Sequence, residues 1–353
     1  MTLSKSKRNF LSSTTAAAAL SAAPAVVRAQ SRDPLRISIW GGSWRDFNAE
    51  FIGKRFTAQT GVPVQYITGG TIDRLNKAKL SKNNPETDLV FTTSHVGWLY
   101  VSDDLFEPLD MSRVPNAAHL FKEGAISPFH VGAWSYVYTI AYRPDLVPSE
   151  IKFNSWADLW NPRLKGMIGL PDFDPSHIIY AAAMLSGAKA ASDWAMGQAK
   201  LRELRPNIRA FYNSDATSQE KIGSGETPVQ VLLSGNAYHM MSQGVKINLV
   251  VPKEGAIVGI DTMAINKGSK RVDLAYQFMN IAWSPEVQSD IANRQRMGPM
   301  STRATVNPDV AKLPGMFTNS RQWQEEAIVI DHKQRAELLG AWRKWFTENM
   351  ISR

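Results

Sequence analysis

LRISIWGGSWRDFNAEFIGKRFTAQTGVPVQYIT, the stretch from Leu35 to Thr68, decides the fold class. It opens with alternating β-rich residues, passes through a Gly-Gly-Ser loop, and continues with apolar residues at helical spacing until Gly61. Glycine is a common helix stop. Strand, helix and strand in this order build a parallel sheet covered by helices. The pattern predicts strands over 35–40, 62–68 and 87–92, and helices over 44–60 and 71–81.

The rest of the chain repeats this alternation and predicts a second α/β unit. A β-rich run over 132–142, ended by Arg143 and Pro144, carries the chain from the first unit toward the second. A chain of 353 residues, 44% of them hydrophobic, suits two domains that each have a core. The pattern further predicts strands over 166–170, 209–212, 228–233, 246–251 and 257–265, and helices over 96–105, 175–185, 193–204, 215–223, 271–282, 285–293 and 323–349.

The first 29 residues have the three-part layout of a secretory signal peptide. Lys5, Lys7 and Arg8 precede an Ala-rich apolar run, and a small-residue cleavage site at Ala29 precedes Gln30. The apolar run is too short and too polar to span a membrane. The basic part resembles a twin-arginine export signal with lysine in its first position, and a general secretion signal is the alternative.

Cysteine content and charge limit the partners of the mature protein. The chain has no cysteine, which excludes disulfides, thiolate metal sites and a lipid attached to cysteine. An exported chain without an anchor is expected in a Gram-negative periplasm. The formal charge of +8 falls to +4 when the four basic residues of the signal leave, and no basic run is interleaved with aromatics. Nucleic acid is therefore not expected as a partner.

Six blocks of sequence resemble the spermidine/putrescine-binding branch of the type-1 extracellular solute-binding proteins. Their order and spacing match over nearly the whole mature chain. The blocks are WGGSW (40–44), FTAQTGVPV (56–64), TDLVFTTS (87–94), NSWADLWNPRLKGMIGLPD (154–172), VPKEGAIVGIDTMAINKGSKRVDLAYQFMN (251–280) and SPEVQ (284–288).

The resemblance implies a two-lobed periplasmic-binding-protein fold (type II), an α/β architecture. Each lobe would hold a mostly parallel sheet flanked by helices, with a hinge at the crossovers between the lobes and a ligand in the cleft. We expect residues 30–141 with 260–305 in lobe 1, and 142–259 with 306–353 in lobe 2. The resemblance further implies a monomer that delivers a small solute to an inner-membrane ABC permease.

No constellation of catalytic residues competes with this interpretation. The sequence has no Gly-x-Ser-x-Gly elbow, no His-Glu-x-x-His motif and no phosphate loop, and its six histidines are scattered without ligand spacing. It also lacks the adjacent tyrosine pair of ferric-ion receptors. We expect neither an enzyme nor a cofactor.

Asp261 is the first candidate for ligand binding. It matches the amine-binding aspartate of the family, and a carboxylate at a cleft wall pairs well with an ammonium group. A cap or a partner for an arginine is the alternative role. Trp40 and Trp44 flank Gly42 and Ser43 in the loop after the first strand, where indole faces can hold a cation or an alkyl chain and glycine allows close approach. Either indole could instead belong to the core.

Further candidates follow other strands. Ser94 ends the third predicted strand and can bind a ligand or cap a helix. Trp134 lies in the run between the two units, where a place at the cleft wall is favoured and a core role is the alternative. Ser176 and His177 begin a helix, beside Asp174, where free amides favour an anion.

Two departures from the family pattern shape the predicted ligand. Gly259 stands where the polyamine binders usually carry a tryptophan, and no glutamate falls near Ser176 or His177. The sequence thus presents one convincing acid, and it predicts a ligand with one amine, such as 4-aminobutyrate, whose carboxylate meets the Ser176 and His177 region. Polyamine-like solutes belong to the same predicted class of amine-containing ligands. A small organic anion is the alternative ligand.

Overall fold

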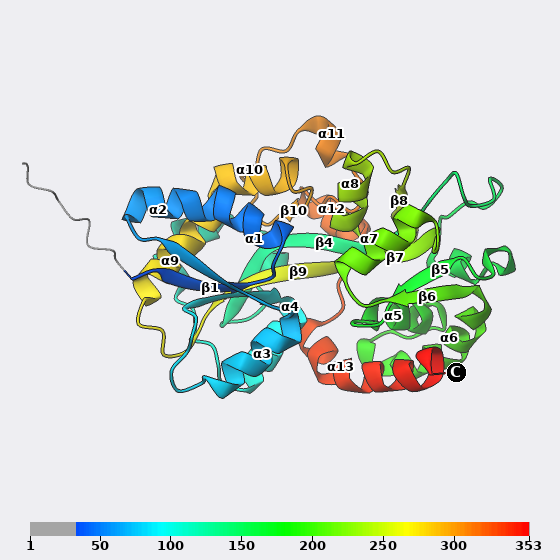
Figure 1. Cartoon of the computed structure of the whole chain (residues 1–353), viewed down its shortest axis with the longest axis horizontal. Coiled ribbons are helices and arrows are strands. Elements are labelled where there is room, and N and C mark those ends of the chain that lie inside the picture. The colour runs from blue at the N-terminus through cyan, green and yellow to red at the C-terminus, as the bar shows by residue number, and fades with distance from the viewer. Residues whose placement is uncertain (1–32, 353) are drawn as a thin grey trace, which may run out of the picture. The chain divides into compact units, whose positions relative to one another are not determined.

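The predicted alternation of strands and helices builds one mixed sheet with helices on its faces (Figure 1). The computed structural model describes residues 33–352, so the predicted signal peptide lies outside the described residues. The strands are β1 (Leu35–Ile39), β2 (Val64–Thr68), β3 (Leu89–Thr93), β4 (His130–Tyr142), β5 (Ile168–Pro171), β6 (Ile208–Tyr212), β7 (Val229–Leu233), β8 (Asn248–Val250), β9 (Ala256–Ile265), β10 (Gly298–Pro299) and β11 (Ala327–Ile328).

The sheet consists of two parallel sets joined by two antiparallel strands. Its order is β2-β1-β3-β9-β4-β7-β5-β6. β1 runs parallel to β2 and β3, and β5 runs parallel to β6 and β7. β9 is antiparallel to β3 and to β4, and β4 is antiparallel to β7. The mixed α/β class and the parallel strands at either end are therefore as predicted.

β4 and β9 carry the chain between the two halves. β4 pairs with β9 from His130 to Tyr138 and with β7 from Tyr138 to Tyr142, so it passes from one half to the other without a break. Both strands are buried almost throughout, and their sequences are correspondingly apolar and aromatic. β4 contains the run over 132–142 that the sequence predicts to lead from the first unit toward the second. The exact lobe bounds given above stay a prediction.

Helices flank the sheet, and their ends follow ordinary chemistry. Gly61 (φ 68°) ends α2 and Gly225 (φ 81°) ends α7 in the left-handed conformation that favours glycine. A π-helical segment, Ala49–Gly53, joins α1 to α2. The α-helices are α1 (Ser43–Asn48), α2 (Lys54–Thr60), α3 (Thr71–Leu80), α4 (Ser94–Ser102), α5 (Ser176–Leu185), α6 (Gln198–Leu204), α7 (Asp215–Ser224), α8 (Ser234–Ser242), α9 (Val272–Ala282), α10 (Pro285–Asn293), α11 (Pro308–Ala311), α12 (Ser320–Glu325) and α13 (His332–Phe346).

The single helix predicted over 323–349 is wrong. α12 ends at Glu325, and β11 then pairs with β9 before α13 begins. The break follows from the β-branched residues 328–330, which favour a strand, and from Asp331, whose carboxylate accepts the Gln334 amide at 2.7 Å and caps α13. α8 was not predicted, and the helix predicted over 193–204 begins instead with a 3-10 segment, Ala191–Gly197.

The core lies on both faces of the sheet. Trp156, Trp283 and Trp342 are fully buried, and the first two donate their indole N–H to backbone carbonyls at 2.8 Å. No helix among residues 33–352 is long and apolar enough to cross a membrane.

Candidate functional site

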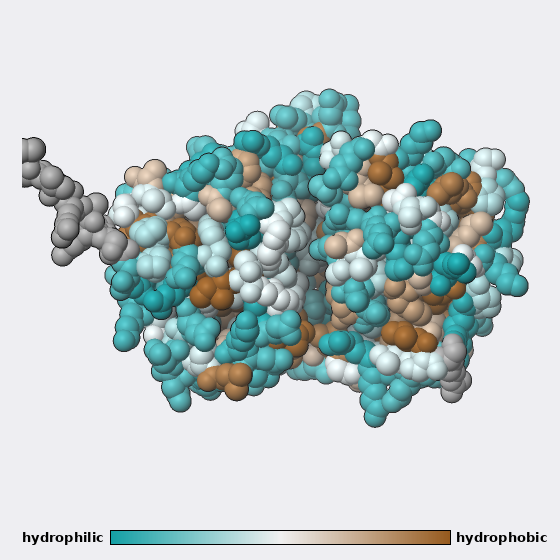
Figure 2. All heavy atoms as spheres, viewed as in Figure 1, coloured by the Kyte–Doolittle hydropathy of each residue, from teal (hydrophilic) through white to brown (hydrophobic). Residues whose placement is uncertain are grey.

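A cavity of about 540 Å³ lies between the two parallel strand sets. It is lined by segments that follow β1, β3, β5 and β6, which is where ligands bind in open α/β sheets. Figure 2 shows a furrow between the two halves on a surface that is otherwise mostly hydrophilic. A volume of this size suits a small solute.

Asp261 lies on β9 at the wall of this cavity, with 3% of its surface exposed. Trp134 donates its indole N–H to Oδ2 at 2.8 Å. Oδ1 is buried without a well-aligned donor among the described residues, although the Tyr136 side chain lies close enough to interact. Burial raises the pKa of Asp261 to about 7, against the lowering effect of Trp134 and Tyr136. Within residues 33–352 no cation forms an ion pair with this carboxylate, although the charge of Arg74 also lowers its pKa.

Aromatic rings cover the wall around Asp261. Trp40 and Trp44 both line the cavity, with ring centroids 6.1 Å apart. Trp134 does not line it; this ring is buried behind Trp44 and stacks on it at 5.8 Å and 9°. Trp134 therefore supports the wall and orients Asp261 from below the surface.

Gly259 makes room for the ring of a tyrosine on the neighbouring strand. β4 and β9 pair Tyr136 with Gly259, and a Cβ at position 259 would come within 2.1 Å of the Tyr136 ring. Glycine here is thus required by the close approach of that ring. Tyr136 lines the cavity, so the aromatic group comes from the neighbouring strand instead of from position 259.

Asp215, which sequence reasoning did not select, is a second carboxylate on the cavity wall. It is the first residue of α7, and Ser214 caps that helix by accepting the Thr217 amide at 3.2 Å. Asn236 donates to Asp215 Oδ1 at 2.8 Å. Burial raises the pKa of Asp215, while hydrogen bonds from Asn236 and Trp44 lower it. Asp215 in turn raises the pKa of Asp261, so the two carboxylates are close enough to repel.

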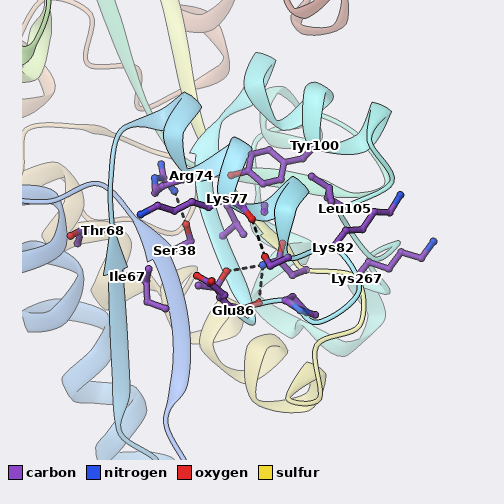
Figure 3. A pocket seen from close by; sticks show the side chains of 16 residues that line it. Ser38, Ile67, Thr68, Arg74, Lys77, Lys82, Glu86, Tyr100, Leu105 and Lys267 are labelled. Carbon is purple, nitrogen blue, oxygen red and sulfur yellow. Dashed lines mark hydrogen bonds between the residues drawn. The ribbon is translucent and has the colours of Figure 1, made fainter.

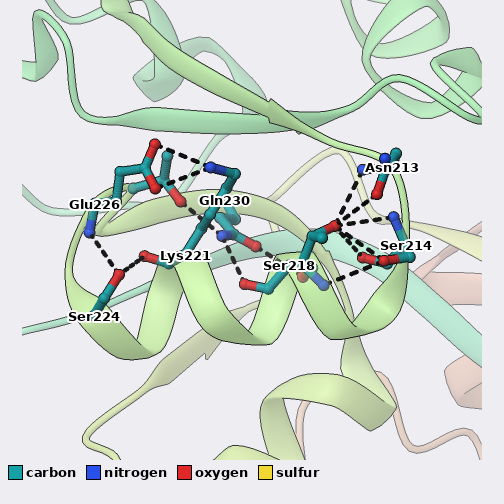
Figure 4. A network of polar contacts seen from close by, with 9 residues as sticks. Asn213, Ser214, Ser218, Lys221, Ser224, Glu226 and Gln230 are labelled. Atoms are coloured by element: carbon teal, nitrogen blue, oxygen red, sulfur yellow. Dashed lines mark hydrogen bonds and ion pairs between the residues drawn. The ribbon is translucent and has the colours of Figure 1, made fainter.

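A buried polar network fixes α7 and therefore Asp215 (Figure 4). Gln230 of β7 is fully buried and donates to the Ser218 carbonyl at 3.1 Å and to Thr227 Oγ1 at 2.7 Å. Ser218 of α7 donates back to Gln230 Oε1 at 3.0 Å. Because these groups satisfy one another, the helix holds one register against the strand.

Ser176 and His177 lie beneath the cavity wall and do not line it. Ser176 bonds through its amide and its hydroxyl to Asp174 Oδ1, at 3.1 and 2.5 Å. His177 accepts from Arg335 at 3.0 Å. Asp174 does line the cavity, and Arg335 donates to its Oδ2 at 2.6 Å. Unlike Asp261, this acid already has a cation.

The other predicted residues lie at the edge of the site. Gly42, in the turn before α1, and Ser43, the first residue of α1, are exposed and do not line the cavity; Gly42 has a φ of 62°. Ser94 is buried at the start of α4, and its hydroxyl pairs with His332 Nδ1 at 2.9 Å. These groups lie at the starts of α1 and α4, next to Trp44 and His95.

Arg74 of α3 supports Trp40 from behind. Its guanidinium lies 4.8 Å from the centroid of the Trp40 ring and donates to Ser38 Oγ at 3.1 Å. Figure 3 shows this arginine beside Ser38 and Tyr100 at a small pocket of about 30 Å³, which has room for roughly one water molecule. The pocket is a packing feature next to the cavity and is too small for a solute.

Comparison with known proteins agrees with this geometry. The chain is 24% identical over 302 residues to the spermidine/putrescine-binding periplasmic protein of Escherichia coli, covering 80% of this chain and 85% of that protein. It is 26% identical to a putrescine/cadaverine-binding protein of Pseudomonas aeruginosa, covering 85% and 91%.

Solved structures confirm the fold. A GABA receptor of known structure aligns with a TM-score of 0.78 at 22% identity, covering 91% of this chain and 99% of that one. The two-lobed periplasmic-binding-protein fold is thereby confirmed. The resemblance seen in the sequence is confirmed by the relatives above and by the family match. Residues 52–318 match the bacterial extracellular solute-binding proteins, and the chain belongs to this family.

Proposed function

We propose that this protein is the substrate-binding component of an ABC importer and that it captures a small amine in the cavity between its lobes. Relatives that bind putrescine or spermidine, together with the acidic and aromatic cavity, support this proposal. The solute then passes to a membrane permease. The signal peptide predicted to end at Ala29 supports a periplasmic location.

The observation that carries the proposal is a pair of cavity carboxylates that are at least partly buried and have no cation, unlike Asp73, an exposed acid that also lines the cavity. Asp261 and Asp215 are held by neutral donors only, and neither forms an ion pair with another described residue. Asp174, on the same wall, is already paired with Arg335. A buried carboxylate normally needs a counter-charge, and a ligand ammonium group supplies one in a charge-assisted hydrogen bond.

Two unpaired acids favour a diamine or polyamine over a ligand with one amine. The single-amine prediction rested on Asp261 alone, and Asp215 adds a second position for an ammonium group. Trp40, Trp44 and Tyr136 would enclose the alkyl chain between the two charges. A small organic anion is disfavoured, because both carboxylates would repel it.

An ω-amino acid such as 4-aminobutyrate is the second candidate, and Arg343 is the observation that favours it. This exposed arginine of α13 also lines the cavity and can pair with a ligand carboxylate. In that arrangement Asp261 would hold the amine and Asp215 would contribute little.

Isothermal titration of the mature protein with putrescine, spermidine, 4-aminobutyrate and succinate tests the proposal. Asp261→Asn should weaken putrescine binding about 100-fold, because removing one side of a buried charge pair costs about 3 kcal/mol. Asp215→Asn should also weaken putrescine binding but should leave 4-aminobutyrate binding intact or stronger. Asp309→Asn, at an exposed position on α11, is the control. Binding of succinate alone, or amine binding unaffected by Asp261→Asn, would overturn the proposal.

A further inference from the structure

A cluster of buried polar groups lies behind the cavity and joins three elements. Arg335 comes from α13, Asp174 and His177 from the start of α5, and His95 from the start of α4. Arg335 has 2% of its surface exposed and does not line the cavity. Asp174 and His95 do line it, from opposite parallel strand sets.

The geometry determines the protonation state of His177. An arginine side chain can only donate hydrogen bonds, so His177 Nε2, 3.0 Å from Arg335 Nη2, must be the unprotonated nitrogen. Nδ1 then carries the proton and faces the Asp174 carbonyl at 3.3 Å. The neutral ring stacks on Tyr138, a cavity residue, with centroids 3.8 Å apart.

The same guanidinium also holds the Asp174 carboxylate. Oδ2 of Asp174 is 2.6 Å from Arg335 Nη2 and 3.5 Å from His95 Nε2. The contact with His95 bridges the two sides of the cavity. Asp174 is thereby kept ionised, which agrees with its pKa lying well below the ordinary range because Arg335 and the nearby histidines outweigh its burial.

We propose that Arg335 is a positioning residue for the ligand cavity: from behind the wall its guanidinium fixes Asp174 and His177, and these hold His95 and Tyr138 at the cavity surface. It touches no ligand. The inference rests on the proposed function only where ligand binding is measured.

Removing the arginine should change how the histidines titrate. Burial and Arg335 together lower the pKa of His177 to about 3, and they lower that of His95 well below its ordinary value. His95 is faced by Arg335, Asp174, His332 and His177. Without the arginine, the unpaired Asp174 favours a protonated imidazole. Protonation of His177 would disturb its stacking on Tyr138.

Imidazole NMR titrations of the ligand-free protein provide the first test, with His177→Gln to assign the signal. In Arg335→Met the protonation constant of His177 should rise at least about tenfold, which is one pKa unit. Arg335→Lys keeps a positive charge beside Asp174 and should keep the protonation constant of His177 low. Arg335→Met combined with Asp174→Asn removes both charges and should also keep it low. Lys344→Met, which removes an exposed charge from the same helix, should change nothing.

Putrescine titrations at pH 8 provide the second test. Arg335→Met should bind putrescine about tenfold more weakly than the wild type, because Asp174 and His177 lose the guanidinium that holds them, whereas Lys344→Met should bind it unchanged. An unchanged His177 titration in Arg335→Met, or a lysine variant that behaves like the methionine variant, would overturn the inference. If the wild type does not bind putrescine, the proposed function fails while the NMR titration still decides the role of Arg335. If Arg335→Met does not fold, the lysine and double variants carry the test.

Discussion

Replacing Asp261 with asparagine should stabilise the ligand-free protein. The pKa of Asp261 is raised from an ordinary 3.8 to about 7, mainly by burial. The folded state therefore holds the proton more tightly than the unfolded state, and its stability falls as the pH rises from about 4 to 7. A shift of about 3 units corresponds to about 4 kcal/mol of lost stability above pH 7. Asparagine keeps an acceptor for Trp134 without the charge.

Urea unfolding of ligand-stripped protein at pH 5 and pH 8 measures this effect. At pH 5 the wild type has already lost part of the stability that protonated Asp261 provides. The difference in free energy of unfolding between Asp261→Asn and the wild type should therefore grow by about 3 kcal/mol from pH 5 to pH 8. Asp309→Asn should show no such growth. An equal pH dependence of the wild type and Asp261→Asn would refute the reasoning, because it would mean that the carboxylate is hydrated in the ligand-free protein. A stabilised variant that no longer binds amines would show that the site trades stability for function.

Four further predictions concern the same region. Putrescine affinity should fall about tenfold per pH unit below pH 7, because the ammonium needs ionised Asp261; titration calorimetry from pH 5 to 8 checks this, and a flat profile would contradict it. Trp134→Phe removes the donor to Oδ2 and should move the midpoint of that profile upward. Gly259→Ala should displace the Tyr136 ring and destabilise the fold by about 1–3 kcal/mol in thermal unfolding, whereas Gly340→Ala, in an open helical position, should not destabilise it. Gln230→Met leaves Ser218 without its partner and should reduce both stability, by about 1–3 kcal/mol, and putrescine affinity through Asp215; a loss of stability alone would separate the network from the site.

Local sequence signals predicted the fold well where they were strong. The strands over 35–40 and 257–265 and the helix ending at Gly61 follow from alternation, helical spacing and a left-handed glycine. The single helix predicted over 323–349 is wrong because residues just before Asp331 pair with β9 as strand β11. Only after that strand does Asp331 become the cap of a new helix. That pairing joins β11 to a distant part of the chain, which no local pattern indicates.

The cavity was predicted in part. Asp261, Trp40 and Trp44 were selected from the sequence and line it. Asp215 was missed because an acid in the first turn of a capped helix has an ordinary local role. The contact of Arg335 with Asp174 joins residues 161 positions apart, and the sequence alone does not bring them together.

The stacked indoles of Trp44 and Trp134 give the protein an intrinsic optical probe. The Trp44 ring lines the cavity, and the Trp134 ring donates to the Asp261 carboxylate. With nearly parallel planes at 5.8 Å, their electronic transitions couple, so a change at either ring alters a shared near-ultraviolet circular dichroism signal. Ligand binding in the cavity and protonation of Asp261 can thus be followed without a label. Trp44→Phe should abolish the coupled signal and leave the signals of the other tryptophans as a baseline.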